Sequence, residues 1–405
     1  MNKQLQVALV SGPAYDRLYE TLPEFTATTG IKINLAFTGD HPSLNHHLAN
    51  LTEVPYDLVS THTKYAPSQL RFLAPLDDIV PLTKLSDFMP LLLELATIDG
   101  LLYGLPRNID VRLLHYRKDL ITEIPGSWDE LYAQAAELNN PPDLYGFVFP
   151  GCESGLFGTF YELSEMAGAH LFPPNLVPDI ENEAGGWALE FLKNLYSRGI
   201  APKDLIRWHY EEVHECFRNG SAAFVCDWPG YYSLYRDAEV SKVSDRFDLT
   251  SYPVGPAHKS LSYGGGHTFA LTKQGVQDPE ALDLLLFLTD IERQMLEARN
   301  GCVPVRRTVM QKMQSEADEA NRTRLAMLDD VIAHHILIPP KFAQYPEVEG
   351  ILWQTVQKAV VGNIPINAAL RHMRNQIEQI VHETGNVASS TNGFRRMAVK
   401  QPEKL

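Results

Sequence analysis

The stretch DGLLYGLPRNIDVRLLHYRKDL, residues 99–120, contains two short strand patterns that the tripeptide PRN separates. The Asp-Gly pair at its start is typical of a tight hairpin turn, and the apolar and aromatic residues after it predict a strand. Pro106 ends this strand, because proline has no N–H to donate to a neighbouring strand. A second apolar run extends from Val111 to Tyr116. We therefore predict that the chain leaves one sheet at Pro106 and enters another at Val111; the alternative is an ordinary β-bend within one domain.

Strands and helices alternate upstream of this stretch. The hydrophobic patterns of 5–11, 31–37 and 56–61 predict strands, and helices are predicted between them over 15–30 and 42–51. Such alternation predicts a parallel sheet with right-handed crossovers. In a sheet of this kind, ligands bind beyond the carboxyl ends of the strands. The candidate ligand residues at these ends are Tyr15, His41, His62 and Thr63.

Downstream, the chain continues as strands and helices and then becomes helical. Further strands are predicted over 145–151, 221–232 and 264–272. From residue 279 onward the pattern favours helices, over 279–299, 308–336, 346–361 and 365–384. The tail 386–405 is polar and rich in Ser, Asn, Lys and Arg, so we expect it to be disordered.

Length and charge limit the class of protein. A chain of 405 residues is too long for one hydrophobic core, so two domains or lobes are expected. The formal net charge of −15 argues against a nucleic-acid partner or an anionic membrane surface. No apolar run approaches the roughly 18 residues that span a bilayer. The N-terminus lacks a signal-peptide pattern, so either the chain has no export signal or its leader has been removed.

The motifs of metal, redox and hydrolytic chemistry are missing. The four cysteines contain no CxxC pair and are expected to be free buried thiols, with a Cys216–Cys226 disulfide as the alternative in an oxidising compartment; the other two are Cys152 and Cys302. The chain has no GxSxG elbow, HExxH motif or Walker A motif. A partial metal-ligand spacing is better explained as a solvated helix face; its residues are His209, Glu211, Glu212 and His214. We expect no metal, no cofactor and no catalytic residue.

Several segments, in their joint order and spacing, resemble the extracellular solute-binding proteins of ABC importers, in the large family that binds sugars and oligosaccharides. The stretch 99–120 is similar to the family's D-G-K-x-Y-G-L-P…L-x-Y-R-K-D-L signature. The other segments that resemble the family are LPEFTATTGIKINL (22–35), YDLVSTHTKYAPSQLRFLAPLDDIV (56–80), PGSWDELYAQAAEL (125–138), FRNGSAAFVCDWPGYY (217–232), YPVGP (252–256), YGGGHTFALTK (263–273), RNGCVPVRRTV (299–309) and PPKFAQYPEVEGILWQTVQKAVVGNIPINAAL (339–370). The family's leader and lipobox are missing, which leaves the compartment open.

The resemblance implies an α/β protein of the type II periplasmic-binding-protein fold, with two α/β lobes, a multi-strand hinge and a ligand cleft between the lobes. The N-terminal lobe is expected to comprise 1–107 and 263–308, and the C-terminal lobe 108–262 and 309–385. The chain is then expected to cross between the lobes near 106–110, 258–263 and 303–310. Because several connections restrict the motion, closure should follow a hinge.

A sugar or polyol has an apolar C–H face and a polar rim, so its site needs an aromatic platform with planar donors and acceptors. Trp228, at the end of strand 221–232, is the first candidate, with a place in the core as the alternative. Tyr263 is a second stacking candidate. The glycines after it permit either close backbone approach to a ligand or a simple bulge. Neighbouring candidates in these two segments are Asp227, Tyr231, Gly264 and Gly265.

The remaining candidate ligand residues come from the crossover and from positions that the resemblance places at the cleft. Asp110 can accept two hydroxyl hydrogen bonds, or it is a solvated loop carboxylate; Asn108 shares its loop. Arg306 either reaches a ligand oxygen or forms a hinge ion pair. The last two candidates, Glu153 and Tyr345, precede or begin helical segments on the C-terminal side.

The resemblance thus implies a non-catalytic, monomeric receptor that captures a carbohydrate or polyol and delivers it to an inner-membrane ABC permease. It implies a periplasmic or extracellular, membrane-associated location. One alternative is a glycosidase-like enzyme that uses Glu153 and Asp227, which requires a carboxylate pair about 5–9 Å apart. Another is a cytoplasmic ligand sensor with the same two-lobe fold, which the missing leader favours.

Overall fold

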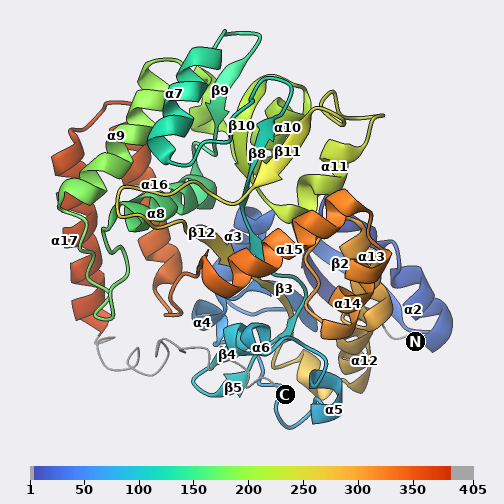
Figure 1. Ribbon diagram of the computed structural model, residues 1–405. Coiled ribbons are helices and arrows are strands. Elements are labelled where there is room, and N and C mark those ends of the chain that lie inside the picture. Colours follow the sequence, from blue (N-terminus) through green and yellow to red (C-terminus); the bar gives the residue numbers. More distant parts are fainter. Residues whose placement is uncertain (1–3, 385–405) are drawn as a thin grey trace, which may run out of the picture.

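The computed structural model describes residues 4–384, which form two α/β lobes (Figure 1). The first lobe is built on a five-stranded sheet. In spatial order its strands are β2 (Lys32–Gly39), β1 (Gln4–Val10), β3 (Leu58–His62), β13 (His267–Leu271) and β6 (Leu105–Pro106). Strand β1 is parallel to β2 and β3, as the alternation predicts, whereas β13 is antiparallel to both of its neighbours.

The second lobe is built on a four-stranded sheet, and a small third sheet lies between the lobes (Figure 1). The strands of the second lobe are β11 (Phe247–Thr250), β8 (Leu113–Arg117), β10 (Ala222–Asp227) and β9 (Tyr145–Val148). The small hinge sheet contains β14 (Ile336–Leu337), β12 (Ser262–Gly265) and β7 (Asp110–Val111).

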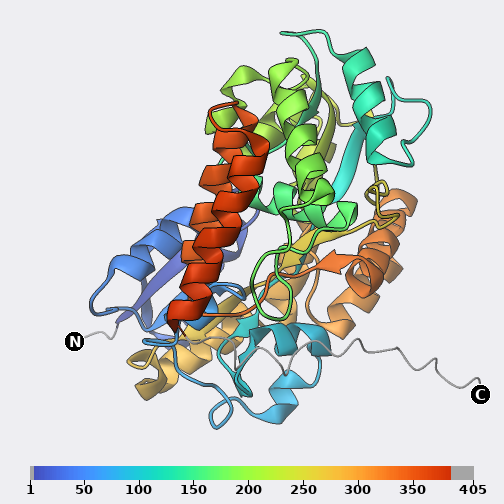
Figure 2. The same ribbon diagram turned by 90° about the vertical axis from the view of Figure 1, so that its left-hand side faces the viewer.

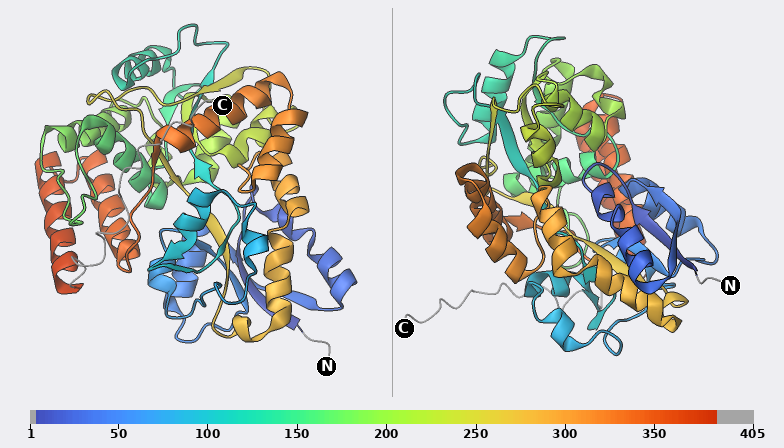
Figure 3. Two further views of the ribbon diagram at one scale, coloured as in Figure 1. Left: turned by 60° about the horizontal axis from the view of Figure 1, so that its bottom comes forward. Right: turned by 90° about the vertical axis from the view of Figure 1, so that its right-hand side faces the viewer.

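Helices cover both sheets (Figures 1 and 3). Those that accompany the first lobe are α1 (Asp16–Tyr19), α2 (Leu22–Thr29), α3 (His41–Asn50), α4 (Ala66–Gln69), α5 (Leu82–Leu85), α6 (Pro90–Ala96), α12 (Pro279–Leu288), α13 (Ile291–Arg299), α14 (Arg307–Glu316) and α15 (Glu319–His334). Those of the second lobe are α7 (Trp128–Leu138), α8 (Glu153–Ala167), α9 (Glu183–Ser197), α10 (Tyr210–Arg218), α11 (Tyr232–Arg236), α16 (Tyr345–Val360) and α17 (Ile366–Thr384). Figure 2 shows α16 and α17 running down one side of the molecule from the second lobe towards the first.

The proline crossover lies where the stretch 99–120 predicts it. The chain leaves the five-stranded sheet at β6, contributes β7 to the hinge sheet, and enters the four-stranded sheet at β8. Pro106 ends β6, a strand that is hydrogen-bonded to one neighbour only, so its missing N–H breaks no ladder on its other side. The hairpin before it joins β4 (Thr97–Ile98) to β5 (Leu101–Leu102), and both turn residues have positive φ angles, 49° at Asp99 and 84° at Gly100.

The chain returns to the first lobe between β12 and β13, where Gly266 separates a hinge strand from a strand of the five-stranded sheet. The last crossing between the lobes, expected near 303–310, stays a prediction. Val309 and Leu328, on α14 and α15, belong to the same hydrophobic cluster as Val7 of β1, and the chain then passes through β14 to α16. The predicted lobe boundaries stay a prediction, and we propose that the last segment of the second lobe begins after β14.

Aspartate caps divide two of the predicted long helices. The segment 279–299 forms α12 and α13, because the Asp290 carboxylate accepts a hydrogen bond from the backbone N–H of Arg293 at 2.8 Å. Asp318 does the same for Asn321 and starts α15 within 308–336. The predicted tail 386–405 lies outside the described residues. Between residues 4 and 384, no helix is long and apolar enough to cross a membrane.

Candidate functional site

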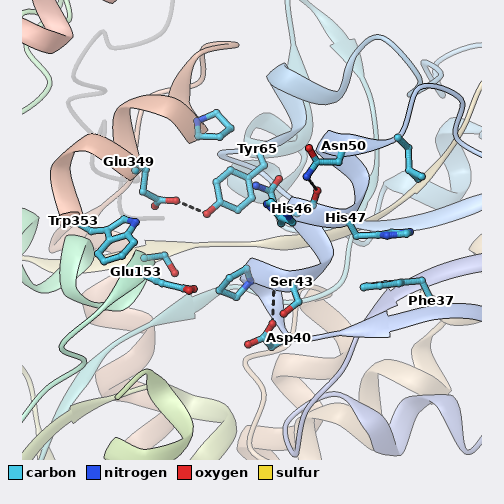
Figure 4. Close-up of a pocket in the computed structure, with 16 residues that line it drawn as sticks. Phe37, Asp40, Ser43, His46, His47, Asn50, Tyr65, Glu153, Glu349 and Trp353 are labelled. Atoms are coloured by element: carbon cyan, nitrogen blue, oxygen red, sulfur yellow. Dashed lines mark hydrogen bonds between the residues drawn. The ribbon is translucent and has the colours of Figure 1, made fainter. Parts of the chain in front are cut away.

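A cavity of about 780 Å³ opens between the two lobes (Figure 4). On one side it is bounded by the end of β2 and by α3 of the first lobe, and on the other by the starts of α8 and α16 of the second lobe. Its walls combine aromatic rings with carboxylates; the residues that matter most for its chemistry are Phe37, Asp40, Tyr65, Glu153, Glu349 and Trp353. An open cavity of this size can hold a small solute.

Local backbone structure fixes the acidic side chains of this cavity. The Asp40 carboxylate caps α3 by accepting a hydrogen bond from the backbone N–H of Ser43 at 2.9 Å. Glu153, the first residue of α8, has a φ of 50°, a left-handed conformation that is uncommon for a side chain other than glycine. Burial, with Asp40 and Glu349 as further contributors, raises the pKa of Glu153. Strain of this kind is often found at functional sites.

One face of α16 supplies both an ionic and an aromatic wall. Glu349 and Trp353 are four residues apart, so they lie one above the other on the helix. The Glu349 carboxylate accepts a hydrogen bond from the Lys64 ammonium at 2.6 Å. It accepts a second one from the Tyr65 hydroxyl, which Figure 4 shows. Both partners come from the first lobe, directly after β3. The cavity wall is therefore assembled from the two lobes together.

Three histidines line a second cavity of about 10 Å³, which shares Asn45 and Tyr65 with the larger one. The ring centroids of His41, His62 and His267 are 4.9–5.0 Å apart. Burial, with the neighbouring histidines and Lys64 as further contributors, lowers the pKa of His41 and His62 well below the usual value. These imidazoles are therefore neutral at pH 7 and offer both donors and acceptors.

The predicted cleft residues near the hinge are tied to this histidine cluster. The Asp110 carboxylate lies 3.6 Å from Nδ1 of His267 and accepts a hydrogen bond from the Asn108 side-chain amide at 2.7 Å. The ring of Tyr15 meets the edge of His267, with centroids 5.2 Å apart. Thr63 is buried beside them and pairs with Gly266 through its backbone N–H at 2.9 Å.

Trp228 stands at the end of β10, as predicted, and is half-buried. Its ring meets the edges of Tyr210 and Tyr263 at centroid distances of 5.5 Å and 6.0 Å. The guanidinium of Arg112 lies 5.3 Å from the Trp228 ring. Trp228 is thus part of an aromatic group at the hinge and does not line the 780 Å³ cavity.

Other predicted residues have their polar groups occupied by the protein itself. Asp227 is 1% exposed and accepts hydrogen bonds from the Tyr235 hydroxyl and from the backbone N–H of Trp228. Burial raises the pKa of Asp227 to about 7. Tyr231 is buried and donates to Glu211 at 3.2 Å. Tyr345 is fully buried, with its hydroxyl 3.3 Å from the Glu349 carboxylate.

Arg306 forms an ion pair, but its partner Asp87 lies in the first lobe and not across the hinge. Its Nε donates to the backbone carbonyl of Thr289 at 2.8 Å, and its guanidinium lies 3.9 Å from the centroid of Phe88. Asp87 is its ionic partner at 3.8 Å. These contacts are all within the first lobe, and Arg306 is not among the residues that line the 780 Å³ cavity.

The glycines after Tyr263 are explained by the packing of the protein against itself. A Cβ atom at Gly265 would lie 2.4 Å from Cε1 of His62, and one at Gly264 would lie 2.7 Å from Cδ1 of Ile336. The side chains that closely approach the backbone of these glycines are therefore those of His62 and Ile336. Whether a ligand also contacts these glycines stays a prediction.

In the cluster around α10, Glu211 and Glu212 are exposed, as a solvated helix face requires, but that interpretation is wrong for His214. This imidazole is 3% exposed and stacks on Tyr231 with ring centroids 3.8 Å apart, because the helix packs against the aromatic turn after β10. Glu211 bridges both rings. Within residues 4–384, no group of three or more His, Cys, Asp or Glu is arranged to hold a metal ion, and all four cysteines are free.

Of the residues singled out from the sequence, Glu153 lines the larger cavity, and His41 and His62 line the smaller one. The important residues that sequence reasoning missed are Lys64, Tyr65, Glu349 and Trp353. Lys64 directly follows Thr63, a candidate ligand residue at the end of the same strand, so the signal for it was present. The four-residue spacing of Glu349 and Trp353 on a predicted helix gave no indication of which face would meet the other lobe.

Two α/β lobes joined by a hinge sheet, with a cavity between them, define a protein that encloses a small ligand between its lobes. The chain belongs to the bacterial extracellular solute-binding proteins, whose family model matches residues 20–323. A probable ABC transporter-binding protein of Deinococcus radiodurans is 26% identical over 238 residues. That match covers 56% of this chain and 56% of the relative, so the chain aligns with about half of that protein.

Solved structures confirm the predicted two-lobe fold. T. maritima MalE3 with bound maltose superimposes with a TM-score of 0.86 at 24% identity, covering 93% of this chain and 99% of that one. An ABC transporter solute-binding protein from Agrobacterium radiobacter K84, in complex with ribitol, gives a TM-score of 0.82 at 22% identity over 93% of this chain and 98% of that one. At these identities the likeness concerns the fold.

Proposed function

We propose that the protein is the solute-binding component of an ABC importer and that it captures a neutral polyol or sugar between its lobes. The observation that carries this proposal is the 780 Å³ cavity, whose walls come from both lobes. The family to which the chain belongs and the maltose and ribitol complexes with the same fold support it.

The cavity offers the two kinds of surface that a polyhydroxylated ligand needs. Trp353 and Tyr65 present ring faces or edges on which a C–H surface can pack. Glu153 and the amides of Asn45 and Asn50 can accept and donate hydrogen bonds to hydroxyl groups. None of the sixteen residues that line the cavity is a lysine or arginine, whereas Asp40, Glu153 and Glu349 contribute carboxyl groups, so the wall favours a neutral ligand over an anionic one.

The mechanism follows from the two-lobe arrangement. A ligand that contacts both α3 and α16 gains contacts on closure, and it therefore shifts the equilibrium towards the closed form. The closed, liganded protein would be recognised by a membrane permease, and we expect the protein to act outside the cytoplasm as a monomer without catalysing a reaction. Trp228, at the hinge, is retained as a second candidate platform that an opened cleft would expose.

A calorimetric titration tests the function directly. Ribitol, mannitol, maltose and glucuronate are titrated into the protein, and we expect a neutral polyol or sugar to bind and glucuronate not to bind. The bound ligand should be recovered unchanged, whereas the glycosidase alternative requires hydrolysis products. Small-angle scattering should show compaction with the bound ligand. Absence of binding to every neutral compound would contradict the proposal.

A further inference from the structure

Lys64 and Glu349 form an ion pair that joins the two lobes at the edge of the cavity. Lys64 follows β3 of the five-stranded sheet, and Glu349 lies on α16, which packs against α8 and α9 of the second lobe. The ammonium nitrogen is 2.6 Å from the carboxylate oxygen, and the two side chains are only 3% and 6% exposed. The pair is therefore an interlobe contact that is shielded from water.

Aromatic side chains complete the surroundings of the Lys64 ammonium. Its Nζ donates a second hydrogen bond to the Tyr263 hydroxyl at 3.0 Å. It lies 4.7 Å from the ring centroid of Tyr65, 5.6 Å from that of Tyr263 and 5.7 Å from that of Tyr345. Tyrosine rings attract a cation through their electron-rich faces. The Lys64 ammonium thus lies among three tyrosine rings. Tyr65 comes from the first lobe, Tyr263 from the hinge sheet and Tyr345 from the second lobe.

The Glu349 carboxylate also has several hydrogen-bond partners. Glu349 accepts hydrogen bonds from Lys64 and Tyr65, and the Tyr345 hydroxyl lies 3.3 Å from the same carboxylate. A buried ion pair stabilises a structure only when its geometry and its additional hydrogen bonds offset the cost of removing both charges from water. Here both charged groups have more than one polar partner, and each of these contacts reduces that cost.

We propose that these five residues, the Lys64–Glu349 latch (Lys64, Tyr65, Tyr263, Tyr345 and Glu349), hold a fraction of the molecules closed before any ligand arrives. A hinge opening that separates α16 from the end of β3 breaks the ion pair and hydrates both charges. The latch rests on the proposed function only in assuming that the lobes open. Because Tyr65 and Glu349 also line the cavity, an entering ligand touches the latch directly.

Small-angle scattering of the ligand-free protein tests the latch. We compare the wild type with Lys64→Met, Glu349→Gln and the double variant. Each single variant leaves one buried charge without its partner, so both should shift the ligand-free curve to a larger radius of gyration. The double variant, which leaves no orphaned charge, should shift it less. Lys312→Met is the matched control, because Lys312 pairs with Glu316 on the surface of α14 and touches no other lobe.

Circular dichroism verifies that each variant is folded. If a single variant does not fold, the comparison of the double variant with the wild type decides, and a larger radius is again expected. Curves identical to the wild type for the folded variants overturn the latch. Since no ligand is present, this result is independent of the titration that tests the proposed function, and either proposal can fail without the other.

Discussion

Arg107 donates two hydrogen bonds to one oxygen of Glu297, from Nε at 2.8 Å and from Nη2 at 2.7 Å. Its Nη1 donates a further hydrogen bond to the Tyr19 hydroxyl at 2.6 Å. Because Arg107 directly follows Pro106, this network fixes the point at which the chain leaves the first sheet. Both charged side chains are almost completely buried.

Arg107→Met should destabilise the fold strongly, because it leaves the Glu297 carboxylate buried without a cationic partner. We expect the free energy of unfolding, measured with urea, to fall by about 3–5 kcal/mol. The double variant Arg107→Met with Glu297→Met should recover part of this loss, since it removes the orphaned charge. A single variant as stable as the wild type would show that the pair contributes little.

Gly265→Ala should disturb the return crossover between β12 and β13. The added methyl group would lie 2.4 Å from Cε1 of His62, so the imidazole must shift. We expect the free energy of unfolding to fall by about 1–3 kcal/mol, as it does when a packed core is overfilled. The matched control is Gly186→Ala on α9, where nothing lies within 4 Å of the new atom and where alanine should stabilise the helix by roughly 0.5–1 kcal/mol. Equal stability of the two variants would contradict this account.

Asp227 should make the protein less stable as the pH rises. Burial raises the pKa of its carboxyl from 3.8 to about 7, so the folded state holds the proton more tightly than the unfolded state. Its stabilising contribution is complete below the ordinary pKa and is lost as the pH rises through about 7. Asp227→Asn should therefore reduce the fall in unfolding free energy between about pH 4 and about pH 8. The exposed Asp245→Asn serves as control, and an unchanged pH profile in Asp227→Asn would contradict the assignment.

Trp353→Ala should weaken ligand binding, because it removes an aromatic wall of the cavity. We expect a loss of about 1–3 kcal/mol, measured by calorimetry with the neutral ligand identified in the titration. Trp187→Ala on α9, a tryptophan outside the cavity lining, should leave the affinity unchanged. The proposed site is wrong if both variants bind like the wild type.

The same substitution at Trp228 tests the platform expected from the sequence. If an opened cleft presents this ring to the ligand, Trp228→Ala should also lower the affinity by about 1–3 kcal/mol. Intrinsic fluorescence on titration provides a second measurement in the wild type. An affinity equal to that of the wild type removes Trp228 from the ligand site and leaves it with a packing role beside Tyr210 and Tyr263.

Local signals explain what could be predicted from the sequence. The Asp-Gly turn at 99–100, the strand break at Pro106 and the strand–helix alternation before it each depend on neighbouring residues, and the structure contains all three. Long helices were predicted less well. Continuous hydrophobic patterns over 279–299 and 308–336 concealed the caps at Asp290 and Asp318, because an aspartate is also an ordinary residue on an exposed helix face.

The cavity depends on contacts between distant segments, which periodicity does not reveal. Lys64 and Glu349 are 285 residues apart, and neither lies in a recognisable motif. The pattern of α16 identifies a buried face through Val348 and Leu352 but says nothing of the lobe that meets Glu349 and Trp353. Strand-end reasoning can place residues at the edge of one sheet, but it cannot show which residues of the other lobe they meet.

Strand β13 lies between β3 and β6 in the first sheet, although about 160 residues separate it from β6 in the chain. During synthesis, the ribosome must therefore deliver all four strands of the second lobe's sheet before residues 267–271 can take their place between β3 and β6. Until then β3 and β6 of the nascent first lobe each have an unpaired edge. Such edges can pair with another chain and aggregate, or they can be bound by a chaperone. A truncated transcript that ends before residue 267 cannot yield a finished first lobe, even though it encodes more than half of the chain.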